Sequence, residues 1–214
     1  MALETGTIVA TALRLLDEVG LDGLTLRRLA AELGVQAPAL YWHFKNKQQL
    51  LDAMAVAMEA PHVTRPVFTD ASQWREWVAD YARGSRSILN SHRDGARLAA
   101  GTRSSPEMFA MVERAVEALE LAGFTVVDAA RGLFTVSNYV AGFVLEEQAD
   151  RTRPDADESG PDMTEFQARY PRIMAALMEE GDPQGDHSFE AGLALILDGM
   201  RLRLSAEGSK TAVD

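Results

Sequence analysis

The residues best suited to chemistry stand near the amino terminus, where Tyr41, Trp42 and His43 follow one another. Tyrosine and histidine side chains can donate hydrogen bonds to phosphate oxygens or to base edges of nucleic acid. Lys47 can neutralise a phosphate, and Arg27 could pair through two hydrogen bonds with a guanine edge. A helix that only packs a core would not carry three such side chains in a row. This stretch therefore predicts recognition of DNA.

The sequence around these residues predicts two short helices joined by a tight turn. Thr25 is a suitable N-cap, because its hydroxyl can accept a hydrogen bond from a free backbone N–H of the first turn. Gly34 can take the left-handed conformation that ends a helix, with Val35 folding back as an apolar contact. Pro38 suits the first helical position, so Ala37 is the expected cap. This is the plan of a helix-turn-helix, whose second helix enters the major groove of DNA.

Two alternatives to DNA recognition stay open on the residues alone. Leu40 and Trp42 could simply pack a small domain, since helix–glycine–helix patterns occur in many proteins that never touch DNA. An enzyme is less favoured, because the four histidines are scattered and form no metal-binding pair at i and i+4. The acid pairs at 146–147 and 179–180 face different sides of a helix. We therefore predict no catalytic residue, no metal site and no cofactor.

The net charge of −11 is divided unevenly along the 214 residues. Residues 1–50 carry five basic and five acidic side chains, so the other 16 basic and 27 acidic residues hold the whole negative excess. An acidic body would repel DNA and leave a locally basic helix-turn-helix face to meet it. An acidic surface is also a common aid to solubility.

Cysteine content and apolar runs bear on the cellular compartment. The chain has no cysteine, which excludes disulfides and thiolate metal sites and fits a reducing environment. It also has no apolar run of eighteen residues and no signal-peptide pattern at its start. We therefore expect a cytoplasmic protein that makes no contact with a membrane.

Helical periodicity continues through the rest of the chain, and no alternation typical of a β-strand reaches a useful length. A first helix is expected over 7–19 with Gly20 as its stop, and a fourth helix after Asn46. Pro61 and Pro66 mark a linker. We predict an all-α protein with a helix-turn-helix DNA-binding domain at 1–46, a connecting helix and linker at 47–69, a helical ligand-binding and dimerisation domain at 70–206, and a frayed tail at 207–214.

Two helices of the body, expected over 128–148 and 188–204, are apolar on more than one side. Such helices must be buried on nearly all sides, and Gly192 and Gly199 would let another helix approach closely. We predict a two-fold homodimer whose interface uses both helices from each copy. The alternative is that they are core helices of a single chain. The polar segment 149–162 between them predicts a mobile loop.

A close resemblance to the tetracycline repressor (TetR) family is carried by residues 21–55, LDGLTLRRLAAELGVQAPALYWHFKNKQQLLDAMA. It continues through SHRDGARLAAGTR and FVLEEQ, and LYWHFKNK is a specific motif within it. The resemblance implies a ligand-responsive transcriptional repressor that acts as a homodimer. In that family an inducer bound to the body swings the reading heads apart and so releases the operator.

The family motif, matched residue by residue, implies DNA contacts at six positions. These are Arg27, Pro38, Tyr41, Trp42, His43 and Lys47. Leu26 and Ala37 stand where the family's namesake has polar residues that contact bases. The resemblance therefore implies the same docking on double-stranded DNA but a different operator sequence.

The effector pocket departs further from the family pattern. The family member that binds magnesium-chelated tetracycline uses a histidine as metal ligand just before its GTR motif, where this chain has Ala99 and Ala100. Other drug-contacting positions hold Val63, Tyr81 and Ser85, whereas Thr102, Arg103 and Glu146 match the family. We therefore expect a different effector that requires no metal.

The body indicates a type of small molecule. Aromatic rings, methionines and a few polar groups are the usual lining of a small-molecule site. The candidates here are Trp77, Tyr81, Thr102, Arg103, Met108, Phe109, Phe134, Asn138, Tyr139, Glu146, Met174 and Met178. We expect an aromatic or largely apolar effector, although most of these residues could instead belong to the core and Arg103 could pair with Glu146.

The rival hypothesis is a DNA-binding dimer controlled by a protein partner, or by no ligand at all. The acidic segment 155–162 would permit such a partner. A closed apolar cavity would favour an effector, and a filled core with an exposed apolar groove would favour a partner.

Overall fold

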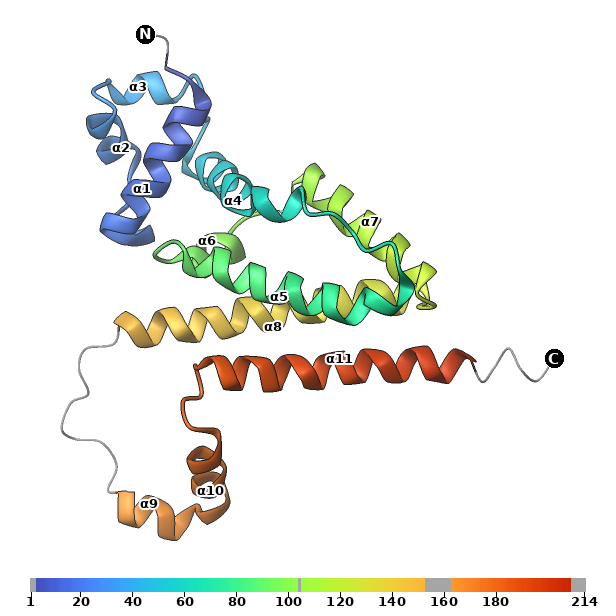
Figure 1. Cartoon of the computed structure of the whole chain (residues 1–214). Helices are drawn as coiled ribbons and strands as arrows, with labels where there is room; N and C mark the ends of the chain where they lie inside the picture. Colours follow the sequence, from blue (N-terminus) through green and yellow to red (C-terminus); the bar gives the residue numbers. More distant parts are fainter. Residues whose placement is uncertain (1–2, 104, 153–162, 209–214) are drawn as a thin grey trace.

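Helices make up all the regular structure in the computed structural model, which describes residues 3–103, 105–152 and 163–208 (Figure 1). The expectation of an all-α protein is confirmed for these residues. The chain begins with α1 (Thr5–Gly23), α2 (Leu26–Glu32) and α3 (Ala37–Leu40), the blue group at the upper left of Figure 1. We call these three helices the head and the helices from α5 onward the body.

The first helix is longer than its apolar pattern suggested. α1 continues to Gly23, but Gly20 within it has a φ of 70°, so the helix is kinked at the residue expected to end it. Ile8, Ala12 and Leu16 are fully buried in the same apolar core as Leu29 of α2. α1 therefore supports the two shorter helices of the head.

The helix α4 (Lys47–Val63) joins the head to the body. Asn46 caps it as expected, because its side-chain oxygen accepts a hydrogen bond from the backbone N–H of Gln49 at 2.9 Å. Pro61 was expected to end the helical pattern, but it lies inside α4, which runs two residues further. A proline in the last turn removes one hydrogen bond and leaves the preceding turns intact.

The frame of the body consists of α5 (Trp74–Asn90), α7 (Pro106–Leu121) and α8 (Val126–Thr152), with the short α6 (Gly95–Ala100) packed against α5 and α8 (Figure 1). A 3₁₀ turn, Ala71–Gln73, precedes α5. Asp70 caps this turn, and its carboxylate accepts a hydrogen bond from the backbone N–H of Ser72 at 2.9 Å.

The last helix, α11 (Asp186–Gly208), lies alongside α8 (Figure 1). A Cβ at Gly192 would collide with the ring of Tyr139, and one at Gly132 would collide with Met200. Small residues therefore do allow close helix packing here, between α8 and α11 of the same chain. The hydroxyl of Tyr139 also donates a hydrogen bond to the carbonyl of Phe189 at 2.9 Å.

Two short helices, α9 (Met163–Arg169) and α10 (Pro171–Glu180), precede α11 in the chain. Tyr170 between them has φ −130° and ψ 56°, because a following proline disfavours the helical conformation. The pair projects away from α8 and α11 (Figure 1).

Part of the expected loop and tail lies outside the described residues, namely 153–162 and 209–214. α8 extends to Thr152, so residues 149–152 are helical and do not belong to a loop. α11 likewise extends to Gly208, the second residue of the expected frayed tail. No helix within the described ranges is long and apolar enough to cross a membrane.

Candidate nucleic-acid interface and ligand cavity

The turn between α2 and α3 has the geometry that the sequence predicted. The hydroxyl of Thr25 accepts a hydrogen bond from the backbone N–H of Arg28 at 3.2 Å. Gly34 has a φ of 67°, and the backbone N–H of Val35 donates to the carbonyl of Ala30 at 2.9 Å. This bond across five residues is the signature of a Schellman motif. The head therefore contains a helix-turn-helix.

The helix α3 is shorter than expected, and its cap is Gln36 instead of Ala37. Pro38 lies in its first turn. The helix ends at Leu40, whose carbonyl accepts a hydrogen bond from the backbone N–H of His43 at 3.0 Å. Residues 41–43 thus form a tight turn at the end of α3 and present their side chains from it.

Exposure separates core from surface around this turn. Leu40 is fully buried and Phe44 is nearly so. Tyr41 is 54% exposed and Trp42 is 91% exposed. Leu40 therefore packs the head, whereas Trp42 does not. Two large aromatic side chains at adjacent positions are therefore accessible to a binding partner.

Two further candidate side chains are anchored at the edge of this surface. The Nδ1 atom of His43 lies 3.1 Å from the hydroxyl of Thr5. The ammonium group of Lys47 donates to the carbonyl of Leu21 at 3.4 Å. Both side chains are only partly buried, so each is oriented while part of it stays accessible.

The remaining candidates for DNA contact, Arg27 and Pro38, are exposed on α2 and α3. Sequence reasoning did not select Lys45, which is also exposed and stands between Phe44 and the cap of α4. Its charge and its place within LYWHFKNK were the available signal. A third cation near the aromatic pair strengthens the surface as a site for phosphate.

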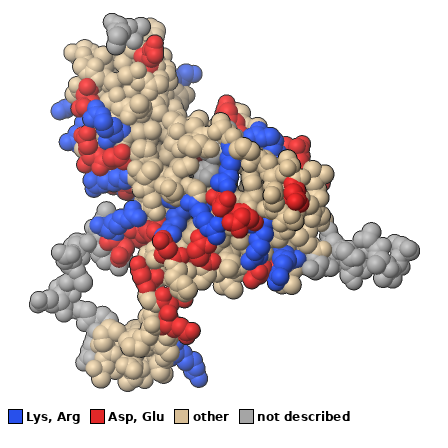
Figure 2. Space-filling view, viewed as in Figure 1, with Lys and Arg blue, Asp and Glu red and all other residues tan. Residues whose placement is uncertain are grey.

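Polar contacts join α1 to the segment that begins α6. The Nδ1 atom of His92 lies 3.0 Å from a carboxylate oxygen of Asp17, and the backbone N–H of Arg93 donates to that carboxylate at 2.9 Å. Arg97 lies 3.2 Å from Asp22. The hydrogen bond from Arg97 lowers the pKa of Asp22, because it stabilises the ionised form. Figure 2 shows basic and acidic side chains interspersed across this junction.

The helix α6 is held at both ends. At its start, Asp94 has a φ of 58°, unusual for a residue with a side chain, and its carboxylate accepts the backbone N–H of Leu21 at 2.8 Å. At its other end, the side-chain amide of Gln48 on α4 donates to the carbonyl of Gly101 at 2.9 Å. These contacts join residues far apart in the chain, and sequence reasoning did not find them.

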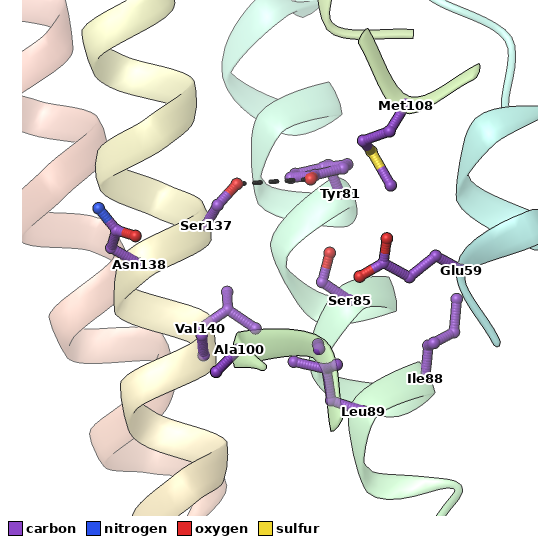
Figure 3. Close-up of a pocket in the computed structure, with 12 residues that line it drawn as sticks. Glu59, Tyr81, Ser85, Ile88, Leu89, Ala100, Met108, Ser137, Asn138 and Val140 are labelled. Atoms are coloured by element: carbon purple, nitrogen blue, oxygen red, sulfur yellow. Dashed lines mark hydrogen bonds between the residues drawn. The ribbon is translucent and has the colours of Figure 1, made fainter. Parts of the chain in front are cut away.

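A cavity of about 280 Å³ lies among α4, α5, α6, α7 and α8 (Figure 3). A second space of about 210 Å³ adjoins it and shares Glu59, Tyr81, Met108 and Ser137. A third, of about 60 Å³, extends towards Arg103. The first two together reach the size of a small-molecule site, for which about 300–1,000 Å³ is typical.

The three spaces gather seven of the residues proposed for ligand contact. These are Trp77, Tyr81, Thr102, Arg103, Met108, Phe134 and Asn138. The others lie elsewhere within one chain: Phe109 and Glu146 are exposed, Met174 and Met178 belong to α10, and Tyr139 faces Phe189. Within the described part of the chain, no ion pair joins Arg103 to Glu146.

Sequence reasoning missed the acid in this cavity. Glu59 lines all three spaces, and burial raises the pKa of its carboxyl. It lies one helical turn after the buried Ala55, so helical spacing could have placed it on the inner face of α4. Ser85 and Ser137 add polar atoms, and the hydroxyl of Ser137 lies 3.4 Å from that of Tyr81.

A second charged group is buried where α5, α8 and α11 meet. Arg86 lies 2.7 Å from Glu147 and 2.8 Å from Asp186. The side-chain amide of Asn90 donates to Glu147 at 2.7 Å, and the guanidinium of Arg86 lies 4.6 Å from the ring centroid of Phe189. Each charge has an opposite partner, so removing one of them would leave a buried charge uncompensated.

The residues of the cavity do not suit a metal ion. Ala99 lines it and carries no donor atom beyond its backbone. Across the described residues, no group of three or more His, Cys, Asp or Glu side chains is arranged to hold a metal. A ligand here must be held by apolar contacts, hydroxyls, an amide and charged side chains.

Two protein-family models match the chain in the same two regions. The model described as "Bacterial regulatory proteins, tetR family" matches residues 8–54, and "Tetracyclin repressor-like, C-terminal domain" matches residues 66–204. The chain belongs to the TetR family. The resemblance seen in residues 21–55 is therefore confirmed, and the match to the C-terminal domain continues to residue 204.

Characterised TetR proteins align with nearly the whole chain. The tetracycline repressor protein class A from transposon 1721 of Escherichia coli is 45% identical over 202 residues, which span 94% of this chain and 92% of the relative. The structure of TetR (class A) in complex with 5a,6-anhydrotetracycline and magnesium has a TM-score of 0.70 at 40% identity, covering 94% of this chain and 99% of that one. BioQ with its natural double-stranded DNA operator has a TM-score of 0.61 at 32% identity, covering 93% of this chain and 98% of that one.

Proposed function

We propose that this chain is a homodimeric transcriptional repressor that binds a palindromic operator and releases it when a small molecule fills the cavity. The observation that carries this proposal is the position of α6. Ala99 and Ala100 at its end line the cavity, while Asp94 and Arg97 at its start contact the head. One short helix thus touches both the ligand space and the DNA-reading domain.

The DNA-binding half of the proposal rests on the head. BioQ, a structural relative, is solved with its double-stranded operator. In this chain the side chains of Arg27, Pro38, Tyr41 and Trp42 are exposed around the helix-turn-helix. His43 and Lys47 border the same surface. We assign base and phosphate contacts to these six residues, and an additional phosphate contact to Lys45.

A homodimer fits the exposed apolar side chains on the outer face of α11. Leu195 and Leu202 lie seven residues apart on that face and are exposed in the single chain. Pairing α8 and α11 with their symmetry mates would bury these side chains in a four-helix interface. Two heads would then read half-sites whose centres lie about one helical turn of DNA, roughly 10 base pairs, or a multiple of it, apart.

Release of the operator follows from coupling through α4 and α6. A ligand in the cavity contacts the end of α6. The residue after this helix, Gly101, accepts a hydrogen bond from the side chain of Gln48 on α4, so a shift of α6 is transmitted to α4. The helix α4 connects the head to the body, and Asp94 at the start of α6 accepts a hydrogen bond from the backbone N–H of Leu21 on α1. The dimer has one conformation in which the two heads can contact both half-sites and another in which the heads are farther apart. A ligand that binds the second conformation more tightly lowers the fraction of protein in the first, DNA-binding conformation.

The effector differs from a magnesium-chelated tetracycline. One relative is solved with 5a,6-anhydrotetracycline and magnesium, but Ala99 lines the cavity where the resemblance places a metal-binding histidine. Aromatic and sulfur-containing side chains, with Ser85, Ser137 and Asn138, suit an organic molecule that is aromatic or largely apolar. The chain acts by binding in the cytoplasm, where bacterial DNA lies, and catalyses no reaction.

A second candidate is a repressor controlled by a protein partner. The exposed apolar residues Ile173, Leu177 and Met178 on α10 favour it, since Ile173 and Leu177 lie about one turn apart on the same face of the helix. The presence of a lined cavity in the body favours the small molecule.

Operator release measured together with thermal stability tests the proposal. Labelled DNA from upstream of the chain's own gene is bound to the full-length protein and titrated with aromatic antibiotics and metabolites, with and without magnesium. A compound that raises the melting temperature and frees the DNA without magnesium supports the proposal. Release only by magnesium-tetracycline would contradict the effector assignment, and failure to bind the DNA would contradict the repressor.

A further inference from the structure

Glu59 is an acid whose carboxylate faces the cavity and has no partner among the described residues. It comes from α4, and its carboxylate points into the space bordered by Ser85, Met108 and Ile88 (Figure 3). No hydrogen bond or ion pair from any described residue reaches it. Arg103 borders the smallest of the three spaces together with Glu59, but the two form no ion pair among the described contacts.

The surroundings of Glu59 differ from those of Glu147, an acid that is buried in the body. Glu147, which is 7% exposed, has Arg86 and Asn90 as partners. Burial removes part of the hydration of Glu59 and thereby raises the pKa of its carboxyl, and no described residue compensates the carboxylate with a hydrogen bond or an ion pair. A desolvated charge without a partner is costly. It is retained at a binding site when the partner arrives with the ligand.

The walls around Glu59 define the rest of that ligand. Tyr81 stacks on Trp77 with ring centroids 5.9 Å apart and an interplanar angle of 11°, so a flat aromatic surface borders the cavity. Met108 faces this surface (Figure 3). Both are suited to hold an aromatic ring, and Met adapts its shape to irregular ligands.

We propose that the cavity selects an aromatic amine whose protonated nitrogen binds Glu59 while its ring packs against Tyr81 and Met108. This inference rests on the proposed function, because it names the chemical class of the effector. An ammonium donates hydrogen bonds to the carboxylate and neutralises it inside a cavity of low polarity. Since Glu59 belongs to α4, the new ion pair acts on the helix that carries the head.

A protonated, neutral Glu59 is the competing role for this residue. A carboxylic acid would donate a hydrogen bond to a neutral acceptor and would not distinguish an amine from an alcohol of the same shape. Matched pairs of compounds therefore separate the two roles. Suitable probes are benzylamine and benzyl alcohol, 1-naphthylmethylamine and 1-naphthylmethanol, and 9-anthracenylmethylamine and 9-anthracenylmethanol.

The experiment measures the affinity of each probe for the full-length protein at pH 7.5 by calorimetry, for wild type, Glu59→Gln and Glu117→Gln. Glu117 is an exposed acid on α7 outside the cavity, so its substitution makes the same charge change elsewhere. We expect wild type and Glu117→Gln to bind at least one amine about tenfold or more tighter than its alcohol, as for a hydrogen bond to a charged group. In Glu59→Gln the ratio should fall to about one.

Equal binding of amine and alcohol by wild type would overturn the proposal, as would an unchanged preference in Glu59→Gln or the failure of every pair to bind. Operator release is recorded in parallel by fluorescence anisotropy. An amine that binds through Glu59 without freeing the DNA would leave the cation site established and contradict only the proposed switch. Release by neutral compounds alone would keep the switch and reject the cation site.

Discussion

His92 and Asp17 are 75 residues apart in sequence, yet the imidazole Nδ1 lies 3.0 Å from the carboxylate and joins the body to the head. The same carboxylate accepts the backbone N–H of Arg93. With Asp22 and Arg97 nearby, this contact makes the orientation of the head depend on where the start of α6 lies. If a ligand displaces α6, these hydrogen bonds and the ion pair transmit the movement to α1 and so to the head.

Asp17→Asn should loosen the head from the body. The substitution weakens two hydrogen bonds, so we expect a loss of about 1 kcal/mol in the free energy of unfolding and faster hydrogen exchange of α1. Operator affinity should also fall, because the heads are less preorganised. A double-mutant cycle with His92→Gln checks the pairing. Additive effects of the two substitutions would show that the side chains do not interact.

Leu40→Ala and Trp42→Ala should have opposite consequences although the residues are neighbours. Leu40 is fully buried, so its truncation should cost about 3 kcal/mol of stability through the cavity it leaves. Trp42 is almost wholly exposed, so its truncation should change stability by less than about 0.5 kcal/mol while weakening operator binding. Chemical denaturation and DNA binding of both variants give the comparison. Unfolding of Trp42→Ala would show that the ring packs the head.

Signals that act within a few residues were readable from the sequence. Thr25, Gly34 and Asn46 cap or end helices as expected, because each acts on backbone groups of its own turn. The all-α architecture followed from periodicity in the same way. The cap at Gln36 was missed because the signal of Pro38 fits two adjacent positions.

Contacts between distant residues could not be read in this way. The Asp17–His92 pair depends on how α1 packs against the turn before α6, which no local pattern specifies. Composition did indicate the type of cavity, since Tyr81, Met108 and Asn138 line it. Glu59 was overlooked because an acid on a helix is ordinarily solvated, and only the tertiary fold turns this one inward.

Glu147→Ala and Glu146→Ala should differ sharply. Adjacent helical residues point about 100° apart, and only Glu147 reaches Arg86. Its removal leaves a guanidinium that is mostly buried without its main partner, so we expect a loss of about 3 kcal/mol in stability. Glu146 is exposed, and its substitution should cost less than about 0.5 kcal/mol. Thermal unfolding of both variants is the measurement. Equal stability of the two would contradict the structural role of the Arg86 cluster.

Lys47→Ala should weaken binding to every DNA sequence by a similar factor. A lysine that neutralises one phosphate releases about 0.9 of a counterion. Because each protomer of the dimer loses one lysine, the slope of log affinity against log salt should fall by about 1.8, while the ratio of operator to random DNA stays constant. Titrations at several salt concentrations provide both values. A change in sequence preference would show that Lys47 contacts a base.

Glu59→Gln should stabilise the protein in the absence of ligand, and more so at higher pH. Burial raises the pKa of Glu59 in the folded chain above its ordinary value of 4.5. Between that value and the higher one, the folded state holds more protons than the unfolded state, so stability falls as pH rises through this window. Glutamine carries no charge and removes the loss.

The gain should be about 0.5–1 kcal/mol at pH 7.5, because the carboxylate is partly open to the cavity and screened. It should vanish below the ordinary pKa, where both states are protonated. Unfolding curves of wild type and variant between pH 4 and 8 give the difference directly, with Glu117→Gln as the control that shows none. A variant less stable than wild type at pH 7.5 would mean that the carboxylate already has a stabilising partner in the free protein. The Glu59 carboxylate would then not be available to bind the ammonium of a ligand.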